Sequence, residues 1–224
     1  MARTRRELVE PVKILAVSDV IVDNLYAPGL RRWVGDVDCV VSCGDLPLYY
    51  LDFLTSMLNV PLFYVFGNHD AGFEYKSSGE IERGVPGGLN LDESARTHGG
   101  LLLAGLAGSR RYRPRAVHQY TEGDMWLKAL RLMPSLLLNR ARRGRFLDIL
   151  VTHAPPFGIH DGPDEPHVGF KTFRGLMRGC RPRYLLHGHK HVYTPGQQTE
   201  TRFEDTTVVN VYPFRVLDIE VPHG

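Results

Sequence analysis

The chain alternates between short apolar segments and longer amphipathic or irregular ones. Five segments rich in β-branched and aromatic residues indicate buried strands, namely residues 12–17, 37–43, 61–66, 147–151 and 183–187. Residues 46–59 carry apolar side chains at helical spacing, with Pro47 suited to a first helical turn. Strands separated by helices are typical of βαβ units, so the pattern predicts an α/β fold built on parallel strands.

The regions between and after these strands have patterns of their own. Residues 71–88 show neither the apolar spacing of a helix nor the alternation of a strand, and they end in Pro-Gly-Gly, so we expect a loop. Residues 89–108 predict strands joined at Gly99 and Gly100. Residues 206–212 and 214–219 alternate like antiparallel strands.

A longer helix is expected after Thr121. Thr121 can accept a hydrogen bond from the start of the helix, and Asp124 stands where a capping box places an acidic residue. Pro134 should kink this helix or divide it in two. Its leucines are expected in the core: Leu127, Leu130, Leu136, Leu137 and Leu138.

Each of the five strands is followed directly by a residue type that binds metals. These residues are Asp19, Asp45, Asn68, His153 and, after the last strand, His189 and His191. A polar turn after a core strand explains one such residue, but chance does not readily explain five. In α/β sheets ligands gather beyond the carboxyl ends of the strands. The pattern therefore predicts a shared site at that edge.

These motifs resemble the calcineurin-like metallophosphoesterase superfamily. Its signature is Asp-x-His, Gly-Asp, Gly-Asn-His-Asp/Glu, an isolated His and Gly-His-x-His, in that order. The match extends from Val12 to His191, and four of the five blocks are intact. The resemblance implies a four-layer α/β/β/α sandwich of two mixed sheets. We expect one domain over residues 1–224, with C-terminal strands within 200–219 completing the second sheet.

The resemblance also implies two divalent metal ions. One ion would be bound by Asp19, Asp45 and His191. The other would be bound by Asp45, Asn68, His153 and His189, with Asp45 bridging. Oxygen and imidazole ligands without thiolates suit borderline and hard cations, so we expect Mn²⁺, with Fe or Zn²⁺ as alternatives.

One block departs from the family pattern. Where Asp-x-His is expected the chain has Asp19, Val20 and Ile21, so an apolar side chain replaces an imidazole of the first metal. We therefore expect the first site to bind its ion weakly. Asp23 could supply a replacement ligand, although a loop residue that caps the following turn is the simpler interpretation.

The resemblance assigns the catalytic roles to the Gly-Asn-His-Asp block. His69 would face the scissile phosphate and protonate the leaving oxygen, and Asp70 would hydrogen-bond the other ring nitrogen of His69. The resemblance implies hydrolysis of a phosphoric ester by a metal-activated hydroxide. We expect a small phosphorylated substrate, a phosphodiester or a nucleotide rather than a phosphoprotein, because the compact chain shows no peptide-docking appendage.

Residues outside the motifs could contact this substrate. Arg110 and Arg111 lie in the most basic stretch, residues 109–115, and either bind phosphate oxygens or form a solvated loop. His160 and His167 are extra imidazoles in the loop that follows His153. Each either contacts the substrate, fills the place left by Ile21 or lies on the surface.

Composition limits the classes of partner and the cellular location that we expect for the protein. The chain has 224 residues, 43% of them hydrophobic, which is enough for a sizeable core. A net charge of +2 argues against strong nucleic-acid binding, and the longest apolar run, residues 101–107, is too short to span a membrane. Three cysteines without paired spacing favour a reducing, cytoplasmic location. The alternative function is a catalytically impaired binding scaffold, which Ile21 favours and the retention of His69 opposes.

Overall fold

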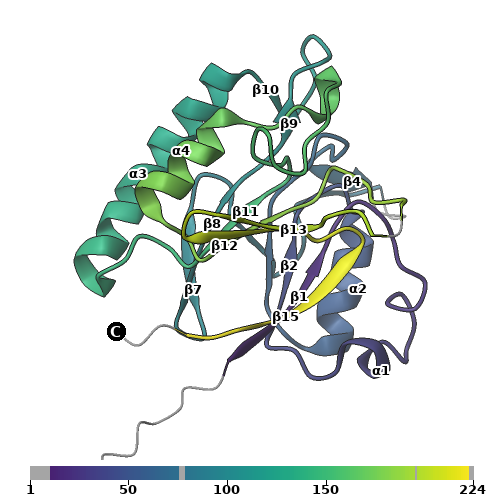
Figure 1. Ribbon diagram of the computed structural model, residues 1–224. Coiled ribbons are helices and arrows are strands. Elements are labelled where there is room, and N and C mark those ends of the chain that lie inside the picture. The colour runs from purple at the N-terminus through teal and green to yellow at the C-terminus, as the bar shows by residue number, and fades with distance from the viewer. Residues whose placement is uncertain (1–10, 76–78, 195, 222–224) are drawn as a thin grey trace, which may run out of the picture.

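Two β-sheets face each other and helices cover the outer face of each (Figure 1). The computed structural model describes residues 11–75, 79–194 and 196–221. Residues 1–10 and 222–224, which the sequence analysis included in the domain, lie outside the described residues. The expected four-layer α/β/β/α sandwich of two mixed sheets is confirmed.

The first sheet has five strands. Their order is β15 (Phe214–Ile219), β1 (Val12–Val17), β2 (Cys39–Ser42), β3 (Leu62–Tyr64) and β6 (Leu89–Asn90). Neighbours from β1 to β6 are parallel, whereas β15 pairs antiparallel with β1, from Val12 opposite Ile219 to Val17 opposite Phe214. The expectation that all the C-terminal strands join the second sheet was therefore wrong for β15.

The second sheet has six strands. Their order is β13 (Glu200–Phe203), β14 (Thr206–Asn210), β12 (Tyr184–His187), β11 (Ile149–Thr152), β8 (Leu101–Leu106) and β7 (Ala95–His98). The four central strands are parallel and the two edge strands are antiparallel to their neighbours. The turn at Gly99 and Gly100 joins β7 to β8, as predicted.

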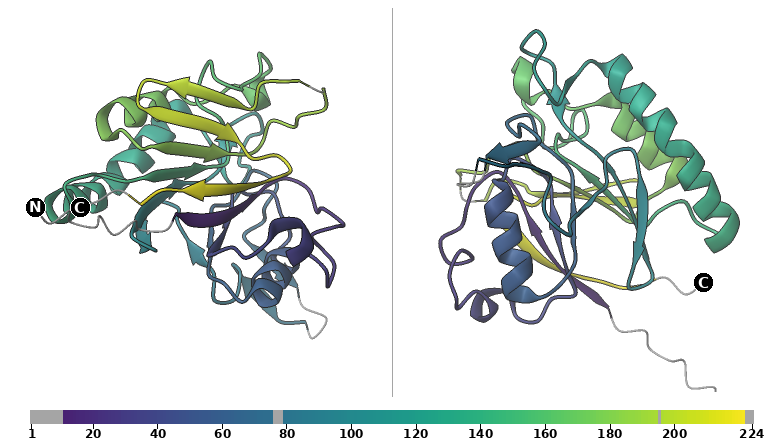
Figure 2. Two further views of the ribbon diagram at one scale, coloured as in Figure 1. Left: turned by 60° about the horizontal axis from the view of Figure 1, so that its bottom comes forward. Right: turned by 180° about the vertical axis from the view of Figure 1, so that it is seen from behind.

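Helices cover the outer face of each sheet (Figure 2). They are α1 (Arg31–Val34) and α2 (Leu48–Leu58) on the first sheet, and α3 (Glu122–Arg143) and α4 (Lys171–Cys180) on the second. The capping box of Thr121 and Asp124 forms as predicted. The expected division at Pro134 does not occur, because α3 continues through this residue. Among the described residues, no helix is long and apolar enough to cross a bilayer.

The remaining elements are short. The stretch 71–88, predicted to be a loop, contains a hairpin of β4 (Phe73–Tyr75) and β5 (Ile81–Arg83). A parallel pair of β9 (Ser109–Arg110) and β10 (Gln119–Tyr120) precedes α3, and a 3-10 helix, η1 (Glu165–His167), precedes α4.

Alternation along the strands builds three apolar layers. In β1, Ile14 and Ala16 belong to the core between the sheets, whereas Leu15 and Val17 belong to the core beneath α2. In β11, Ile149 lies in the inter-sheet core and Leu150 packs beneath α3 and α4. This period of two is what a strand buried on both faces requires.

The leucines of α3 do not all lie in the core. Leu136 is buried, but Leu127, Leu130, Leu137 and Leu138 are 44–54% exposed. The sequence prediction was wrong for these four because the helix is apolar on more than one face, and only one face packs on the sheet.

Candidate metal centre

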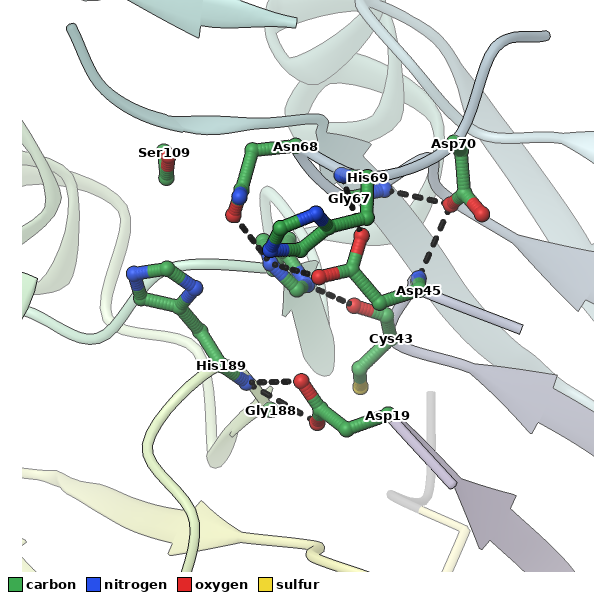
Figure 3. A network of polar contacts seen from close by, with 12 residues as sticks. Asp19, Cys43, Asp45, Gly67, Asn68, His69, Asp70, Ser109, Gly188 and His189 are labelled. Carbon is green, nitrogen blue, oxygen red and sulfur yellow. Dashed lines mark hydrogen bonds and ion pairs between the residues drawn. The ribbon is translucent and has the colours of Figure 1, made fainter. Parts of the chain in front are cut away.

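Polar side chains from both sheets converge where the carboxyl ends of their strands meet (Figure 3). Asp45 follows β2, His153 follows β11 and His189 follows β12, and one ligand atom from each lies within 4.8 Å of the others. The Oδ1 atom of Asn68, which follows β3, lies 2.9 Å from His153 Nε2. We call Asp45, Asn68, His153 and His189 the central ligand set. The structure brings these four predicted residues together.

Backbone carbonyl groups fix which nitrogen of each histidine faces the centre. His153 Nδ1 lies 2.8 Å from the carbonyl oxygen of Cys43, and His189 Nε2 lies 2.7 Å from that of Pro166. A carbonyl only accepts, so these two nitrogens carry the protons. That leaves His153 Nε2 and His189 Nδ1 as the ring nitrogens that face the centre, which is how metal-binding histidines are oriented. The residues present therefore fit a divalent cation.

Burial and neighbouring charges shift the pKa values of the residues at the centre. Burial alone would raise the pKa of Asp45, but the charge and hydrogen bond of His153 outweigh it and the pKa is about 2. Burial alone would lower the pKa of His153, but the Asp45 carboxylate raises it to about 9. Burial, and next the charge of His153, lower the pKa of His189 to about 4. Without a cation, a proton on His153 balances Asp45.

Asp19 and His191 form a second group beside this set. Both carboxylate oxygens of Asp19 accept from the backbone N–H of His189, each at 3.0 Å. His191 Nε2 lies 3.7 Å from Asp19 Oδ1, and its Nδ1 lies 2.6 Å from the hydroxyl oxygen of Tyr193. These contacts place two predicted ligands of the first metal side by side.

Two residues in the loop after β1 bear on the missing imidazole: Ile21, which stands in its place, and Asp23, a candidate replacement. Ile21 is half-buried and packs against the apolar core beneath α2. Asp23 is exposed, and its carbonyl group accepts from the backbone N–H of Tyr26 in a turn. Neither side chain lines the cavity described below.

The backbone is strained where it presents these side chains. Asp19, Asp45 and His189 have φ angles of 67°, 56° and 65°, in the left-handed region that residues with a Cβ rarely adopt. Gly67 makes the convergence sterically possible, because a Cβ there would lie 2.1 Å from Asp45 Oδ1 and 2.6 Å from His153 Cε1. These residues therefore adopt unfavourable backbone angles, and these angles bring their side chains together.

A cavity of about 410 Å³ opens over the centre. It is lined by Asp19, Asp45, His69, His167, His189, Lys190, His191 and Tyr193. The backbone N–H of His69 donates to Asp45 Oδ1 at 2.8 Å, which ties this residue to the ligand set. The exposed imidazole of His69 lies at the cavity, next to the carboxylate of Asp45 (Figure 3).

Asp70 has partners other than the one predicted. Its Oδ2 accepts from the backbone N–H of Asp45 at 2.8 Å and from that of Gly67 at 2.7 Å, whereas its expected partner was the His69 ring. These bonds join the turns after β2 and β3, so Asp70 positions Asp45 rather than His69. Burial and the neighbouring Asp45 charge raise the pKa of Asp70 to about 6.

The arginines expected to bind substrate lie elsewhere. Arg110 pairs with Glu122 at 3.0 Å and Arg111 with Asp124 at 2.9 Å, and neither lines the cavity. Both bind the first turn of α3, where acidic residues favour the helix dipole. Tyr112, the residue after Arg111, reaches the centre instead. Its hydroxyl oxygen accepts a hydrogen bond from Asn68 Nδ2 at 3.2 Å.

His160 also lies away from the cavity lining. Its Nδ1 is 3.0 Å from His187 Nε2 and its Nε2 is 2.9 Å from Thr201 Oγ1, while His187 Nδ1 bonds the carbonyl oxygen of Gly188. These three bonds are all satisfied by neutral rings, and burial lowers the pKa of both histidines. The other loop imidazole, His167, lines the cavity, with its ring centre 5.1 Å from that of His189.

Three residues at the centre were not predicted from the sequence. Lys190 and Tyr193 line the cavity, and Tyr112 orients Asn68. Lys190 stands between the two motif histidines and Tyr193 comes two residues later, so their position beside Gly-His-x-His was an available signal. Tyr112 and Asn68 are 44 positions apart, so no pattern in the sequence around either residue predicts their contact.

Comparisons with known proteins identify the family and the fold of the chain. The calcineurin-like phosphoesterase family profile matches residues 13–193. The structure resembles that of TT1561 of Thermus thermophilus, with a TM-score of 0.61 and 17% identity over 93% of this chain and 99% of the other. A second solved structure gives a TM-score of 0.59 and 16% identity over the same shares.

Other comparisons add little. A weaker likeness to vacuolar protein sorting 29 from Cryptosporidium parvum has a TM-score of 0.43 and 12% identity over 90% of this chain and 74% of the other. No curated protein sequence gives a match. The structural likenesses establish the fold, and the profile covers most of the chain, including every residue of the central ligand set. The chain belongs to the calcineurin-like phosphoesterase family.

Proposed function

We propose that the protein is a metal-dependent phosphoesterase that hydrolyses a phosphodiester or nucleotide-type substrate in the cavity beside His69. The observation that carries the proposal is the convergence of Asp45, His153 and His189, from three strand ends in two sheets, within 4.8 Å. Buried carboxylate and imidazole groups at such spacing are costly to assemble without a cation to bind them.

The central ligand set would hold one divalent ion, and Asp19 and His191 would contribute to a second, with Asp45 shared. We propose Mn²⁺ as the cofactor, with Fe or Zn²⁺ as alternatives, because the donors are oxygens and imidazoles. Such ions, when bound, lower the pKa of water and neutralise charge on phosphoryl oxygens. The first site, that of Asp19 and His191, should be the weaker, because Ile21 offers no ligand where the family pattern has an imidazole.

Residues of the chain would supply the proton for the leaving oxygen and hold the catalytic groups in position. Hydrolysis adds the hydroxyl group of water to phosphorus and breaks the bond to the leaving oxygen, which must gain a proton. His69 would donate that proton, since its imidazole lies at the cavity with its backbone held by Asp45. General acid catalysis of this kind is typically worth about 10²–10⁴ in rate. Asp70 would act through the backbone as a positioning residue.

The ammonium group of Lys190 at the cavity favours an anionic substrate. Lys190 and His167 line it together with the predicted ligands, and they would take the role first assigned to Arg110 and Arg111. A cavity of about 410 Å³ suits a small phosphorylated molecule. The three cysteines are free, buried thiols, which supports a reducing, cytoplasmic location as part of the proposal.

The alternative is a phosphoesterase fold that binds a partner without turnover. The apolar Ile21 favours it, because an incomplete first site would weaken catalysis. His69 opposes it, because a scaffold has no need for an imidazole at the mouth of a cation site.

The test is hydrolysis of a chromogenic phosphodiester by the purified chain with Mn²⁺. We expect His69→Ala to lose at least about 10²-fold in turnover while metal content stays unchanged. His98→Ala is the matched control, since His98 bonds the carbonyl oxygen of Asp38 at the opposite end of the strands. Absence of turnover in the native chain with metal bound would favour the scaffold, and full activity of His69→Ala would remove the catalytic assignment.

A further inference from the structure

Three rings gather at the end of the Gly-His-x-His turn. The ring of Tyr212 stacks on that of His191, with the ring centres 4.5 Å apart and an angle of 18° between the planes. The hydroxyl oxygen of Tyr193 lies 2.6 Å from His191 Nδ1, and the Tyr193 ring meets both other rings edge-on. One partner therefore holds the face of the imidazole and another holds its Nδ1 atom. We call Tyr193 and Tyr212 the tyrosine pair.

The tyrosine pair is anchored to a buried residue. Asn210, the last residue of β14, is 1% exposed. Its Oδ1 accepts from the backbone N–H of Tyr212 at 3.0 Å, and its Nδ2 donates to the carbonyl oxygen of Lys190 at 2.7 Å. A buried amide whose oxygen and nitrogen both have partners favours a single arrangement. Tyr212 is thus fixed relative to the residue that precedes His191.

His191 is turned toward Asp19 by these contacts. His191 Nε2 lies 3.7 Å from Asp19 Oδ1, and Asp19 is itself held by two hydrogen bonds from the backbone N–H of His189 (Figure 3). Both ligands of the first site are therefore placed in advance, which lowers the entropic cost of binding an ion. This matters most at a site where Ile21 leaves an ion with fewer protein ligands.

The hydroxyl group of Tyr193 can make a second hydrogen bond. An imidazole that binds an ion through Nε2 carries its proton on Nδ1, so His191 Nδ1 would donate to the hydroxyl oxygen of Tyr193. A phenol hydroxyl accepts and also donates. Tyr193 lines the cavity over the centre and is 78% exposed, so its own proton can reach an anion bound there.

We propose that the tyrosine pair positions His191 for the first ion and that the hydroxyl group of Tyr193 also donates a hydrogen bond to a phosphoryl oxygen of the substrate. The pair offsets part of the affinity that the first site loses through Ile21. This inference rests on the proposed metal-dependent function, but it concerns the site of Asp19 and His191 and makes no use of the central ligand set or of His69.

Titration of the full chain with Mn²⁺, followed by electron paramagnetic resonance of the free ion, tests the positioning of His191. We expect one tight ion, at the central ligand set, and one weaker ion. Tyr193→Phe and Tyr212→Leu should each weaken the second ion about 10–100-fold and leave the tight ion unchanged. Tyr49→Phe is the control, because Tyr49 is 51% exposed, packs against Tyr26 and does not line the cavity. Thermal unfolding checks that each variant is folded.

Binding of inorganic phosphate, measured by titration calorimetry, distinguishes the two tyrosines. The Mn²⁺ concentration is set high enough to fill both sites in every variant. Tyr193→Phe should still bind phosphate about 3–10-fold more weakly than the wild type, because a donor to the anion is lost. Tyr212→Leu should recover the wild-type affinity under these conditions, because it acts only through the ion.

The contrary outcomes separate this inference from the proposed function. A wild-type chain that binds no Mn²⁺ would overturn both. A single ion at the central ligand set, with none at Asp19 and His191, would overturn only the inference. Unchanged affinity for the second ion in Tyr193→Phe would exclude the positioning role, as would an equal loss in Tyr49→Phe. Equal phosphate affinity of Tyr193→Phe and the wild type at saturating Mn²⁺ would exclude the contact with substrate.

Discussion

His153 Nδ1 lies 2.8 Å from the carbonyl oxygen of Cys43, a residue 110 positions earlier in the chain. The bond joins the end of β11 in the second sheet to the end of β2 in the first. It turns His153 Nε2 toward Asp45 and Asn68, at 3.3 Å and 2.9 Å. The centre is therefore a product of how the two sheets face each other, and its chemistry depends on that contact.

The stability of the metal-free protein should fall as the pH rises from about 6.5 to about 9. His153 has an ordinary pKa of 6.5 and a folded pKa of about 9, so its stabilising ion pair with Asp45 is fully present below 6.5 and is lost as pH approaches 9. The lowered pKa values of His187 and His189 affect stability only below 6.5. Thermal unfolding in EDTA should show this slope, and His153→Gln should flatten it. An equally steep slope in the variant would contradict this account.

Metal binding should release a proton from His153. The ion takes the lone pair that the proton occupies, so affinity should rise about tenfold per pH unit up to the folded pKa of about 9. Titration calorimetry with Mn²⁺ in two buffers of different ionisation enthalpy measures the proton count at about pH 7.5, where we expect about one proton for the first ion bound. No release would mean that His153 is not a ligand.

Tyr112→Phe should weaken metal binding without altering the fold. The hydroxyl group of Tyr112 accepts from Asn68 Nδ2 and so directs Asn68 Oδ1 toward His153. Loss of such an outer contact typically costs about 10–100-fold in metal affinity. Arg111→Ala is the control from the same stretch and should leave metal affinity and KM unchanged, since Arg111 pairs with Asp124. A rise in KM for Arg111→Ala would restore the original assignment to substrate binding.

Gly67→Ala should disrupt the centre. The added methyl group would overlap Asp45 Oδ1 and crowd His153, so we expect destabilisation of about 1–3 kcal/mol and at least tenfold weaker Mn²⁺ binding. Gly179→Ala is the control, because a Cβ there meets nothing within 4 Å and alanine favours a helix by about 0.5–1 kcal/mol. Chemical denaturation and metal titration measure both effects. Unchanged metal affinity in Gly67→Ala would contradict the close convergence of Asp45 and His153.

Sequence analysis located the central ligand set because each member immediately follows a strand, and parallel strands place their carboxyl ends at one edge. It misplaced residues whose partners are distant in sequence. Arg110 lies in a basic loop by pattern, yet Glu122 at the start of α3 binds it. The pairing of β15 with β1 joins the two ends of the chain, and no local pattern encodes it. Leu130 is apolar at a helical period, but period alone does not show which face meets the sheet.

Ile21→His should raise the number of tightly bound ions. The imidazole would supply the ligand that the family pattern places near Asp19, at the cost of apolar packing beneath α2. We expect metal analysis after dialysis to show more metal per chain than in the wild type, with stability lower by about 1 kcal/mol. Ile21→Ala is the control for lost packing and should gain no metal. An unchanged count would indicate that the histidine cannot turn from the core toward Asp19.

We propose that Asp45, Asn68, His153 and His189 hold a divalent cation beside His69. Anomalous diffraction from crystals grown with Mn²⁺ tests it most directly, because it locates and counts the ions without reference to activity. We predict a strong peak within bonding distance of His153 Nε2 and His189 Nδ1, and a weaker one between Asp19 and His191. Crystals that show no peak among these four residues in saturating Mn²⁺ would contradict the account.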